Sequence, residues 1–261
     1  MPYSLFVSSK VSKETNAPLI VALHGMGGNP GSLMRGNTLE LADEGGYIVV
    51  APMGYNSSGW YGMPMSPGGR GRSGRGAPAT APQTQATNRL AAAQPARGRG
   101  GAAAGGIAET DPAKIRQLSE IDVVNVLEMV RKEFKIDDRR TYLMGHSMGG
   151  GGTLFLGEKY ATNWAAIAAI APAAFGFQPN SLAKIKDMPV MIVQGDADTM
   201  VQPAMTRRWV DELKALNMTY EYKEIAGGDH GSVITTGMPD IFKFFAKYSK
   251  PEPKAGDSKT P

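Results

Sequence analysis

Hydrophobic runs of strand length alternate with longer stretches of helical period along most of the chain. The runs that predict strands are YSLFV, PLIVALHG (18–25), YIVVAP (47–52), TYLMGH, WAAIAAIAP, PVMIVQG (189–195) and YEYKEI. The stretches that predict helices are SLMRGNTLELADEGG (32–46), SEIDVVNVLEMVRKEF (119–134) with Ser119 as N-cap, MGGGGTLFLGEKY, PAMTRRWVDELKALN (203–217) and MPDIFKFFAKY. Strands that alternate with helices are typical of a mostly parallel sheet. The pattern therefore predicts an α/β fold with helices on both faces of the sheet.

Two segments depart from this pattern. Residues 62–108 consist largely of Gly, Ala, Pro, Arg, Ser, Thr and Gln, and residues 249–261 form a polar tail that contains proline. Such compositions bury too little apolar surface to offset the entropy of ordering the chain. We therefore expect a single domain over 1–248, with a flexible insert at 62–108 and a disordered tail.

Composition narrows the chemistry that the chain can perform. The net charge of +4 belongs to the insert, because residues 62–108 hold six arginines and no acid. The chain has no cysteine, which excludes disulfides, thiolate metal sites and a cysteine nucleophile. Its three histidines are His24, His146 and His230, so any chemistry that depends on histidine must use one of them.

One serine lies where a predicted strand runs directly into a predicted helix, in YLMGHSMGGGGT (142–153). Residues Gly145 to Gly149 match the G-x-S-x-G elbow, which requires a strand before it and a helix after it. Small neighbours permit the tight turn, which strains the serine and raises its hydroxyl above the carboxyl edge of the sheet. Ser147 is therefore the candidate nucleophile.

A serine hydroxyl needs a base that accepts its proton. His230 lies in AGGDHGS, the loop between the last strand and the last helix, and is the candidate base. His146 is expected to be a packed, hydrogen-bonded residue of the turn. Of the two carboxylates that follow the strand at 189–195, Asp198 is the candidate for orienting the imidazole, and Asp196 is expected to bond its own turn.

The negative charge that develops during acyl transfer requires two N–H donors. The backbone N–H of Met148, at the start of a helix, is the first candidate. The second is expected in the loop HGMGG, from Met26 or, next, from Gly27, where small residues let the backbone approach a substrate. His24 is expected to brace this loop.

Aromatic residues follow two other strands at the same edge. Trp60 and Tyr61 either form an aromatic wall for a substrate or pack the base of the insert, and both alternatives stay open. Phe175, in APAAFGFQP, either lines the pocket or packs. Trp164 and Trp209 occupy core-like patterns and are expected to be structural.

At these residues the chain resembles the α/β-hydrolase superfamily. Within it, the chain is similar to the branch of polyhydroxybutyrate depolymerase-like proteins and feruloyl esterases, whose members carry similar HGxGG, GHSMGGGGT and GDxDxxV blocks. The order Ser147, Asp198, His230 is also that of the superfamily. The resemblance covers 1–61 and 109–248, so the insert departs from it.

The resemblance implies a catalytic domain of the α/β-hydrolase fold with a sheet of the eight-stranded type, and a serine esterase that works through an acyl-enzyme without cofactor or metal. The expected substrate is a small or polymeric ester of an aryl, short-chain or hydroxycinnamoyl acid, or a polyester. Because many relatives are exported, the resemblance implies a secreted or periplasmic location; the N-terminal segment shows no signal peptide, so a cytoplasmic location stays the alternative. No run approaches the roughly 20 apolar residues of a membrane span. The oligomeric state also stays open.

Two alternatives accompany the esterase hypothesis. Peptidases that resemble prolyl-oligopeptidase catalytic domains use the same chemistry, although they usually need an added domain or charged anchors, which this sequence lacks. A binding role is the other alternative, because RGRSGRG and ARGRGG resemble arginine–glycine segments that bind polyanions. The insert has no aromatic after Tyr61 on which a base could stack, so no specific nucleic-acid function is expected.

Overall fold

A computed structural model describes residues 2–65 and 109–252 of the chain. In this part of the chain seven strands form one sheet in the spatial order β1-β3-β2-β4-β5-β6-β7, with β1 antiparallel to β3 and every other pair parallel. The strands are β1 (Tyr3–Val7), β2 (Ala17–Leu23), β3 (Ile48–Pro52), β4 (Ile136–His146), β5 (Ala166–Ile170), β6 (Val190–Gly195) and β7 (Tyr220–Ile225). The α-helices are α1 (Thr38–Gly45), α2 (Pro112–Glu133), α3 (Met148–Lys159), α4 (Pro203–Ala215) and α5 (Ser232–Lys247). Short 3₁₀ helices are η1 (Pro30–Leu33), η2 (Trp60–Gly62), η3 (Ala161–Asn163) and η4 (Pro179–Ile185).

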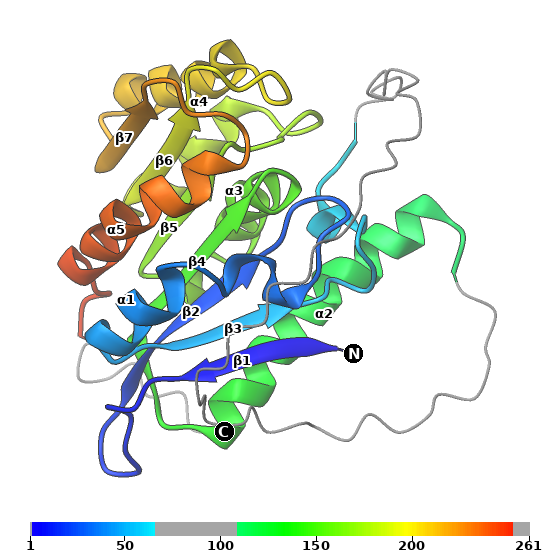
Figure 1. Ribbon diagram of the computed structural model, residues 1–261. Helices are drawn as coiled ribbons and strands as arrows, with labels where there is room; N and C mark the ends of the chain where they lie inside the picture. Colours follow the sequence, from blue (N-terminus) through cyan, green and yellow to red (C-terminus); the bar gives the residue numbers. More distant parts are fainter. Residues whose placement is uncertain (1, 66–108, 253–261) are drawn as a thin grey trace, which may run out of the picture.

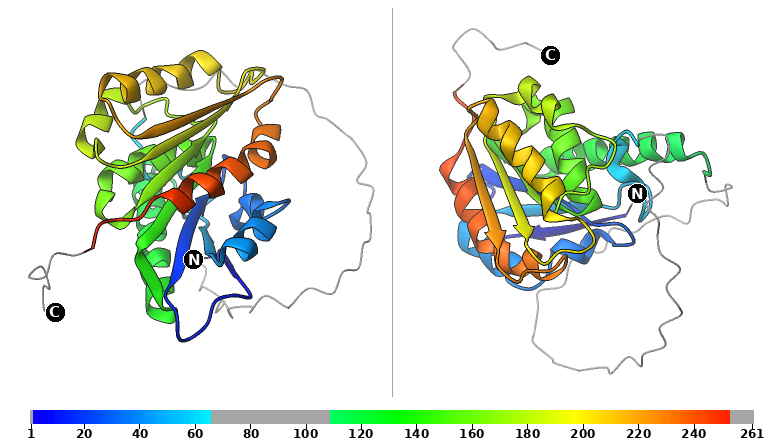
Figure 2. Two further views of the ribbon diagram at one scale, coloured as in Figure 1. Left: turned by 90° about the vertical axis from the view of Figure 1, so that its left-hand side faces the viewer. Right: turned by 90° about the horizontal axis from the view of Figure 1, so that it is seen from above.

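Helices cover both faces of the sheet (Figures 1 and 2). Alternate residues of β2 divide between two cores, because Leu19, Val21 and Leu23 face one side and Ile20 and Ala22 face the other. The first core packs against α2, α3 and α4, and the second packs against α1 and α5. Fully burying each of these leucine, valine or isoleucine side chains stabilises the fold by roughly 1.5–3 kcal/mol. The predicted α/β fold with helices on both faces is therefore confirmed.

Parallel strands place the loops of the candidate site at one edge of the sheet. The segments that follow β2, β4, β5 and β6 all leave from the carboxyl ends of neighbouring strands, as does the loop after β7. None of the described helices is long and apolar enough to cross a membrane.

Two predicted helices differ from the observed ones at their beginnings. The stretch 32–46 forms a helix only from Thr38, because a 3₁₀ turn precedes it. The helix predicted from Ser119 begins seven residues earlier, where Asp111 accepts the N–H of Ala113 and Pro112 occupies the first helical position. Ser119 is consequently buried inside α2 and is not its N-cap.

The sheet and the last helix also differ from expectation. The resemblance implied an eight-stranded sheet, whereas the described residues form seven strands. The last helix was expected at Met238 and begins instead at Ser232, so that Pro239 lies inside it.

The folded domain extends further than predicted, both into the start of the expected insert and into the start of the expected tail. Met63 is fully buried, and a Cβ on Gly176 would lie 2.0 Å from the carbonyl oxygen of Pro64, so the chain stays packed up to residue 65. At the other end, the N–H of Lys250 donates to the carbonyl oxygen of Arg139 at 2.9 Å. The expected disordered tail therefore does not begin at 249. The rest of the predicted insert, with its arginine–glycine segments, and the end of the tail lie outside the described residues.

Candidate active site

Ser147 connects β4 to α3 in a strained conformation, with φ 56° and ψ −116°. Its N–H donates to the carbonyl oxygen of Ile170 at 2.9 Å, and its own carbonyl oxygen accepts from Gly151 and Ala173, both at 2.9 Å. A non-glycine residue holds such a backbone only where the surroundings enforce it. Here the next strand, the following helix and the loop after β5 all hold the serine in place.

The glycines around the serine allow backbone to pack directly on backbone. A Cβ on Gly145 would lie 2.3 Å from the carbonyl oxygen of Gly149, and a Cβ on Gly149 would lie 2.1 Å from the carbonyl oxygen of Leu23. No side chain fits at either distance, because these are far inside van der Waals contact. The sharp turn from β4 into α3 therefore requires glycine at both positions.

His230 and Asp198 form an ion-pair geometry next to this turn. His230 Nδ1 lies 2.8 Å from Asp198 Oδ2, while Asp198 Oδ1 accepts the N–H groups of Met200 at 2.8 Å and Val201 at 2.9 Å. Burial by itself raises the pKa of Asp198, but the hydrogen bonds from His230 and the two N–H groups outweigh it and hold the pKa below its ordinary value. Asp198 is thus an anion at neutral pH, and Nε2 is the ring nitrogen of His230 that can accept a proton.

His146 attaches the His230 loop to the residue beside the serine. Its Nε2 lies 2.7 Å from the carbonyl oxygen of His230, and the two ring centroids are 4.6 Å apart. Burial, and next to it the nearby charge of His230, lower the pKa of His146 to about 4. The expectation that His146 is a packed, hydrogen-bonded turn residue is confirmed.

Asp196 takes a different position from the one expected. Its Oδ1 accepts the N–H of Gly227 at 2.7 Å, so it joins the loop after β6 to the loop after β7 and does not close its own turn. This hydrogen bond therefore holds the two loops together near Asp198 and His230.

The loop after β2 lies against the serine. A Cβ on Gly25 would come within 3.3 Å of Ser147 Cβ. The N–H of Gly27 donates to the carbonyl oxygen of Ser57 at 2.7 Å, so it is engaged. Within the described part of the chain the N–H of Met26 makes no hydrogen bond, and the N–H of Met148, as the first residue of α3, has no partner in its own helix. Of the two candidates in this loop, Met26 is therefore the one whose N–H has no partner among the described residues.

Buried side chains brace the same loop. The two ring nitrogens of His24, which is 1% exposed, face the carbonyl oxygens of Gly25 at 2.8 Å and Met53 at 2.9 Å. The hydroxyl of Tyr61 donates to the carbonyl oxygen of His24 at 3.2 Å. The expectation that His24 braces the loop is confirmed.

The segment that follows β3 is strained and is held by α2. Tyr55, Trp60 and Tyr61 all have positive φ, at 64°, 56° and 49°. The buried carboxylate of Asp122 accepts the N–H of Gly54 at 2.8 Å, and burial raises its pKa although this bond opposes the shift. The hydroxyl of Ser119 accepts the N–H of Tyr61 at 3.2 Å. Because Ser57 of this segment holds Gly27, α2 acts indirectly on the loop beside the serine.

The structure separates the aromatic residues into two groups. Tyr61 is fully buried and packs on Gly152, so of its two alternatives the packing role holds and the wall for a substrate does not. Trp60 is half-buried, and its ring lies 6.1 Å from that of Phe175, which is 38% exposed. Trp164 and Trp209 are 3% and 4% exposed and are structural, as predicted.

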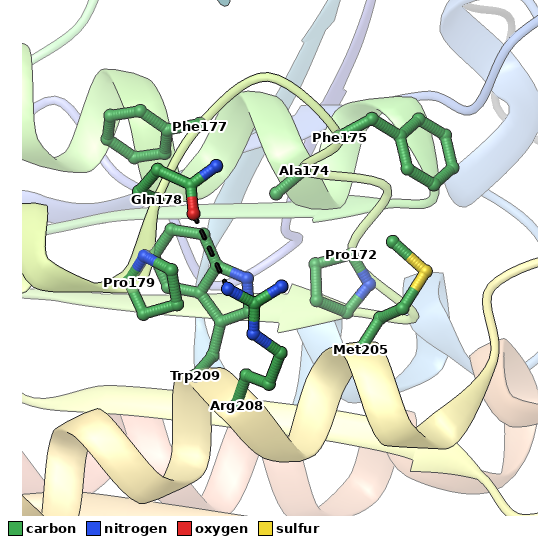
Figure 3. Close-up of a pocket in the computed structure, with 9 residues that line it drawn as sticks. All are labelled: Pro172, Ala174, Phe175, Phe177, Gln178, Pro179, Met205, Arg208 and Trp209. Carbon is green, nitrogen blue, oxygen red and sulfur yellow. Dashed lines mark hydrogen bonds between the residues drawn. The ribbon is translucent and has the colours of Figure 1, made fainter. Parts of the chain in front are cut away.

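A small pocket lies between the loop after β5 and α4 (Figure 3). Phe177 packs at its edge, with ring centroids 5.6 Å from both Phe155 and Trp209. Gln178 and Arg208 face each other across it at 3.5 Å. Phe177 is therefore a packing residue, and Phe175 is the aromatic of this loop that reaches Trp60.

Sequence reasoning did not single out Gln194, which lies one residue before the end of β6. Its Nε2 is 3.1 Å from Asp198 Oδ2, the oxygen that also bonds His230. No motif marks a glutamine at this place.

Within residues 2–65 and 109–252, no three or more His, Asp and Glu side chains are grouped so that they could hold a metal ion.

The parallel sheet, the strained serine between β4 and α3, and the acid and histidine on the loops after β6 and β7 define an α/β-hydrolase. A family model described as "PETase: PET hydrolase-like" matches residues 110–250, more than half of the chain. The chain belongs to this α/β-hydrolase family, as the resemblance to serine esterases of this superfamily predicted.

Solved structures share the fold at low sequence identity. A thermostable esterase is 20% identical with a TM-score of 0.63, and the match covers 95% of this chain but 59% of that one. An S-formylglutathione hydrolase from Agrobacterium tumefaciens is 16% identical with a TM-score of 0.61, over 94% of this chain and 88% of that one. A CE1 ferulic acid esterase from Anaeromyces mucronatus, in complex with ferulic acid, is 16% identical with a TM-score of 0.63, over 94% and 84%. No curated protein matches the chain.

Proposed function

We propose that the chain is a serine hydrolase that cleaves carboxylic esters through an acyl-enzyme. Ser147 is the nucleophile, His230 the base and Asp198 the residue that orients the base. The observation that carries this proposal is the bond between His230 Nδ1 and Asp198 Oδ2 at 2.8 Å, made by a histidine whose carbonyl is fastened to His146, the neighbour of the serine. Membership in the PET hydrolase-like family supports the same chemistry.

In the first half-reaction Ser147 Oγ attacks the ester carbonyl carbon while His230 Nε2 takes the hydroxyl proton. The carbonyl oxygen becomes an oxyanion, which the N–H groups of Met26 and Met148 stabilise. When the tetrahedral intermediate collapses, the C–O bond to the alcohol breaks and the alcohol takes the proton from His230. Losing one donor of such a pair typically costs about two to three orders of magnitude in rate.

In the second half-reaction water replaces the alcohol. His230 Nε2 takes a proton from water as its oxygen attacks the acyl carbon, and the same two N–H groups hold the new oxyanion. Collapse returns the proton to Ser147 Oγ and releases the carboxylic acid. The anion of Asp198 stabilises the imidazolium in both halves, because its Oδ2 accepts a hydrogen bond from Nδ1–H throughout and stays ionised.

The substrate class follows from the family and from the aromatic pair of Trp60 and Phe175. We assign Trp60 and Phe175 to the wall of the acyl or alcohol site, with the backbone around Gly27 near the ester. A polyester is suggested by the family's description, and a ferulic acid esterase is among the proteins that share the fold. The proposed substrates are therefore aryl, hydroxycinnamoyl or polyester esters.

A secreted or periplasmic location belongs to the same proposal, since it rests on the resemblance to exported esterases. Fractionation of the native cells, with an antibody to the chain, tests it. Recovery of the chain in the cytoplasmic fraction alone would contradict it.

A substrate panel tests the proposed activity. It contains p-nitrophenyl esters of increasing chain length, hydroxycinnamate esters, a polyester film and a peptide p-nitroanilide, each incubated with the wild type and with Ser147→Ala. Hydrolysis of esters by the wild type and its loss in the variant are expected. Equal activity in both proteins would overturn the proposal, and cleavage of the anilide alone would favour a peptidase.

A further inference from the structure

Gln194 occupies a fully buried position on β6, and its amide nitrogen, which carries two protons, lies within hydrogen-bond distance of three oxygens. Its Nε2 lies 3.1 Å from Asp198 Oδ2, 3.1 Å from the carbonyl oxygen of Gly195 and 3.1 Å from the carbonyl oxygen of Val201. All three oxygens are acceptors. The terminal atom that faces them must therefore be the nitrogen of the amide, because an oxygen there would be repelled by all three.

The other end of the amide is held by a second buried side chain. Thr206, in the first turns of α4, is fully buried, and its Oγ1 lies 2.6 Å from Gln194 Oε1. Since Oε1 can only accept, the hydroxyl of Thr206 donates. This bond fixes the amide in the one orientation that directs its N–H groups at Asp198.

The two oxygens of the Asp198 carboxylate are thus held by different parts of the chain. Oδ1 accepts two backbone N–H groups of its own loop, whereas Oδ2 accepts from Gln194 and from His230 Nδ1. Without the amide, Oδ2 would keep only the imidazole as a partner, and rotation about Cβ–Cγ would be restrained only by the two N–H groups on Oδ1 and by the imidazole itself. The plane of the carboxylate sets the plane of the imidazole that bonds it.

We infer that Gln194, oriented by Thr206, is the positioning residue that holds Asp198 Oδ2 in line with His230 Nδ1. The inference rests on the proposed function, because it assigns Gln194 a role in the same triad. Gln194 touches neither the substrate nor Ser147, so it acts through Asp198.

The amide also disperses charge on Oδ2. An N–H donor on the carboxylate weakens the hold of Asp198 on the imidazolium form of His230. When the donor is removed, the imidazolium becomes more stable and His230 stays protonated to higher pH. Because the base must be neutral, the acidic limb of the rate profile should then move to higher pH.

The other titratable groups near His230 and Asp198 bond groups other than the amide of Gln194. His146 bonds the carbonyl of His230 and not its ring nitrogens. The carboxylate of Asp229 accepts the N–H groups of Gly231 and Ser232, and that of Asp196 accepts the N–H of Gly227. None of these three groups is a hydrogen-bond partner of Gln194.

Four variants test the inference on the full chain. Gln194→Met removes the amide at similar length, Thr206→Val removes the orienting hydroxyl, and Thr206→Ser restores it. Thr141→Val is the matched control, because Thr141 is also fully buried but its hydroxyl donates to the carbonyl oxygen of Asp137, at the opposite end of the sheet. Circular dichroism and thermal unfolding confirm that each variant is folded.

With p-nitrophenyl acetate, kcat of Gln194→Met should fall by about tenfold to a hundredfold while KM changes little, since a small misplacement of a catalytic group costs up to about a hundredfold. Its acidic limb should move to higher pH. Thr206→Val should show the same changes to a smaller extent, and Thr206→Ser and Thr141→Val should resemble the wild type.

Two outcomes would overturn the inference. One is that folded Gln194→Met keeps the kcat and pH profile of the wild type. The other is that Thr141→Val loses as much activity as Thr206→Val, which would indicate a general effect of buried threonine.

A readout without substrate separates this inference from the proposed function. The Nδ1 proton of His230 is observed by ¹⁵N-edited NMR in the wild type, Gln194→Met and Thr141→Val. A change in its chemical shift and exchange rate in Gln194→Met alone supports the inference even if no ester is hydrolysed. An unchanged resonance in Gln194→Met overturns it, whatever the activity of the wild type.

Discussion

His146 Nε2 lies 2.7 Å from the carbonyl oxygen of His230, and this contact connects the turn at Ser147 to the loop that carries the proposed base. A carbonyl oxygen can only accept, so Nε2 of His146 carries the proton and donates it. The bond positions the backbone of His230 independently of its bond to Asp198. His230 is thus held at two points, one on its backbone and one on its ring.

Removing this donor should impair catalysis more than binding. His146→Phe keeps a ring of similar size but cannot donate, and we expect kcat to fall by about tenfold with KM little changed, because a displaced base loses alignment with Ser147. His146→Gln keeps an N–H at similar reach and should recover most of the activity. Steady-state kinetics on one p-nitrophenyl ester measure both. If the two variants were equally active, the hydrogen bond would not matter.

The stability of the protein should fall as the pH is lowered from about 6.5 to about 4. His146 has its pKa lowered to about 4 from the ordinary value of 6.5, so the unfolded chain binds a proton in this interval that the folded chain does not. At pH 4 the full loss from this residue amounts to about 3 kcal/mol at most. Asp198, whose pKa is held low, contributes stability above its ordinary value of 3.8 that is lost as the pH falls further.

Urea denaturation of the wild type and His146→Gln between pH 4 and 7.5 checks this expectation. The free energy of unfolding of the wild type should decline across the interval, and that of the variant should decline less. Parallel curves for the two proteins would show that His146 does not carry this pH dependence.

Gly149→Ala should destabilise the fold strongly. A Cβ there would lie 2.1 Å from the carbonyl oxygen of Leu23, and backbone on both sides cannot give way as a flexible side chain can. We expect a loss of at least about 3 kcal/mol, the upper range for overpacking. Gly231→Ala is the control for stability, because its Cβ would meet no atom closer than 3.7 Å. Similar melting temperatures for the two variants would contradict this reading of the turn.

Phe175→Ala should affect aryl substrates selectively. Phe175 is 38% exposed and its ring lies 6.1 Å from that of Trp60, so removing the ring costs little stability but opens the proposed aromatic wall. An aromatic contact is worth about 0.5–1.5 kcal/mol, which corresponds to about a twofold to tenfold rise in KM for hydroxycinnamate esters. Acetate esters should be hydrolysed as by the wild type. An equal change in KM for hydroxycinnamate and acetate esters would show that Phe175 does not line the substrate site.

Much of the fold and the choice of candidate residues could be predicted from local patterns. The alternation of strands and helices can be predicted from short stretches of sequence. The glycines around Ser147 likewise indicate its sharp turn without information from distant residues. The order of Ser147, Asp198 and His230 came from the same kind of signal. Their catalytic roles remain predictions.

What could not be predicted depends on contacts between distant residues. Tyr61 is buried because Gly152, far along the chain, leaves room for its ring, and no local pattern reports that space. Ser119 suits an N-cap by residue type, yet it lies in the interior of α2, where its hydroxyl accepts the N–H of Tyr61 from a distant segment. Gln194 has no motif, since its place beside Asp198 follows from a turn at the end of β6 and from a threonine on the next helix.

The measurement that tests the central claim most directly is the identification of the residue that forms the covalent intermediate. The protein is treated with an organophosphonate that reacts with activated serines, digested, and mapped by mass spectrometry, with Ser147→Ala treated in parallel. A single adduct on Ser147 in the wild type and none in the variant is the predicted result. An adduct on another residue that persists in Ser147→Ala would contradict the account.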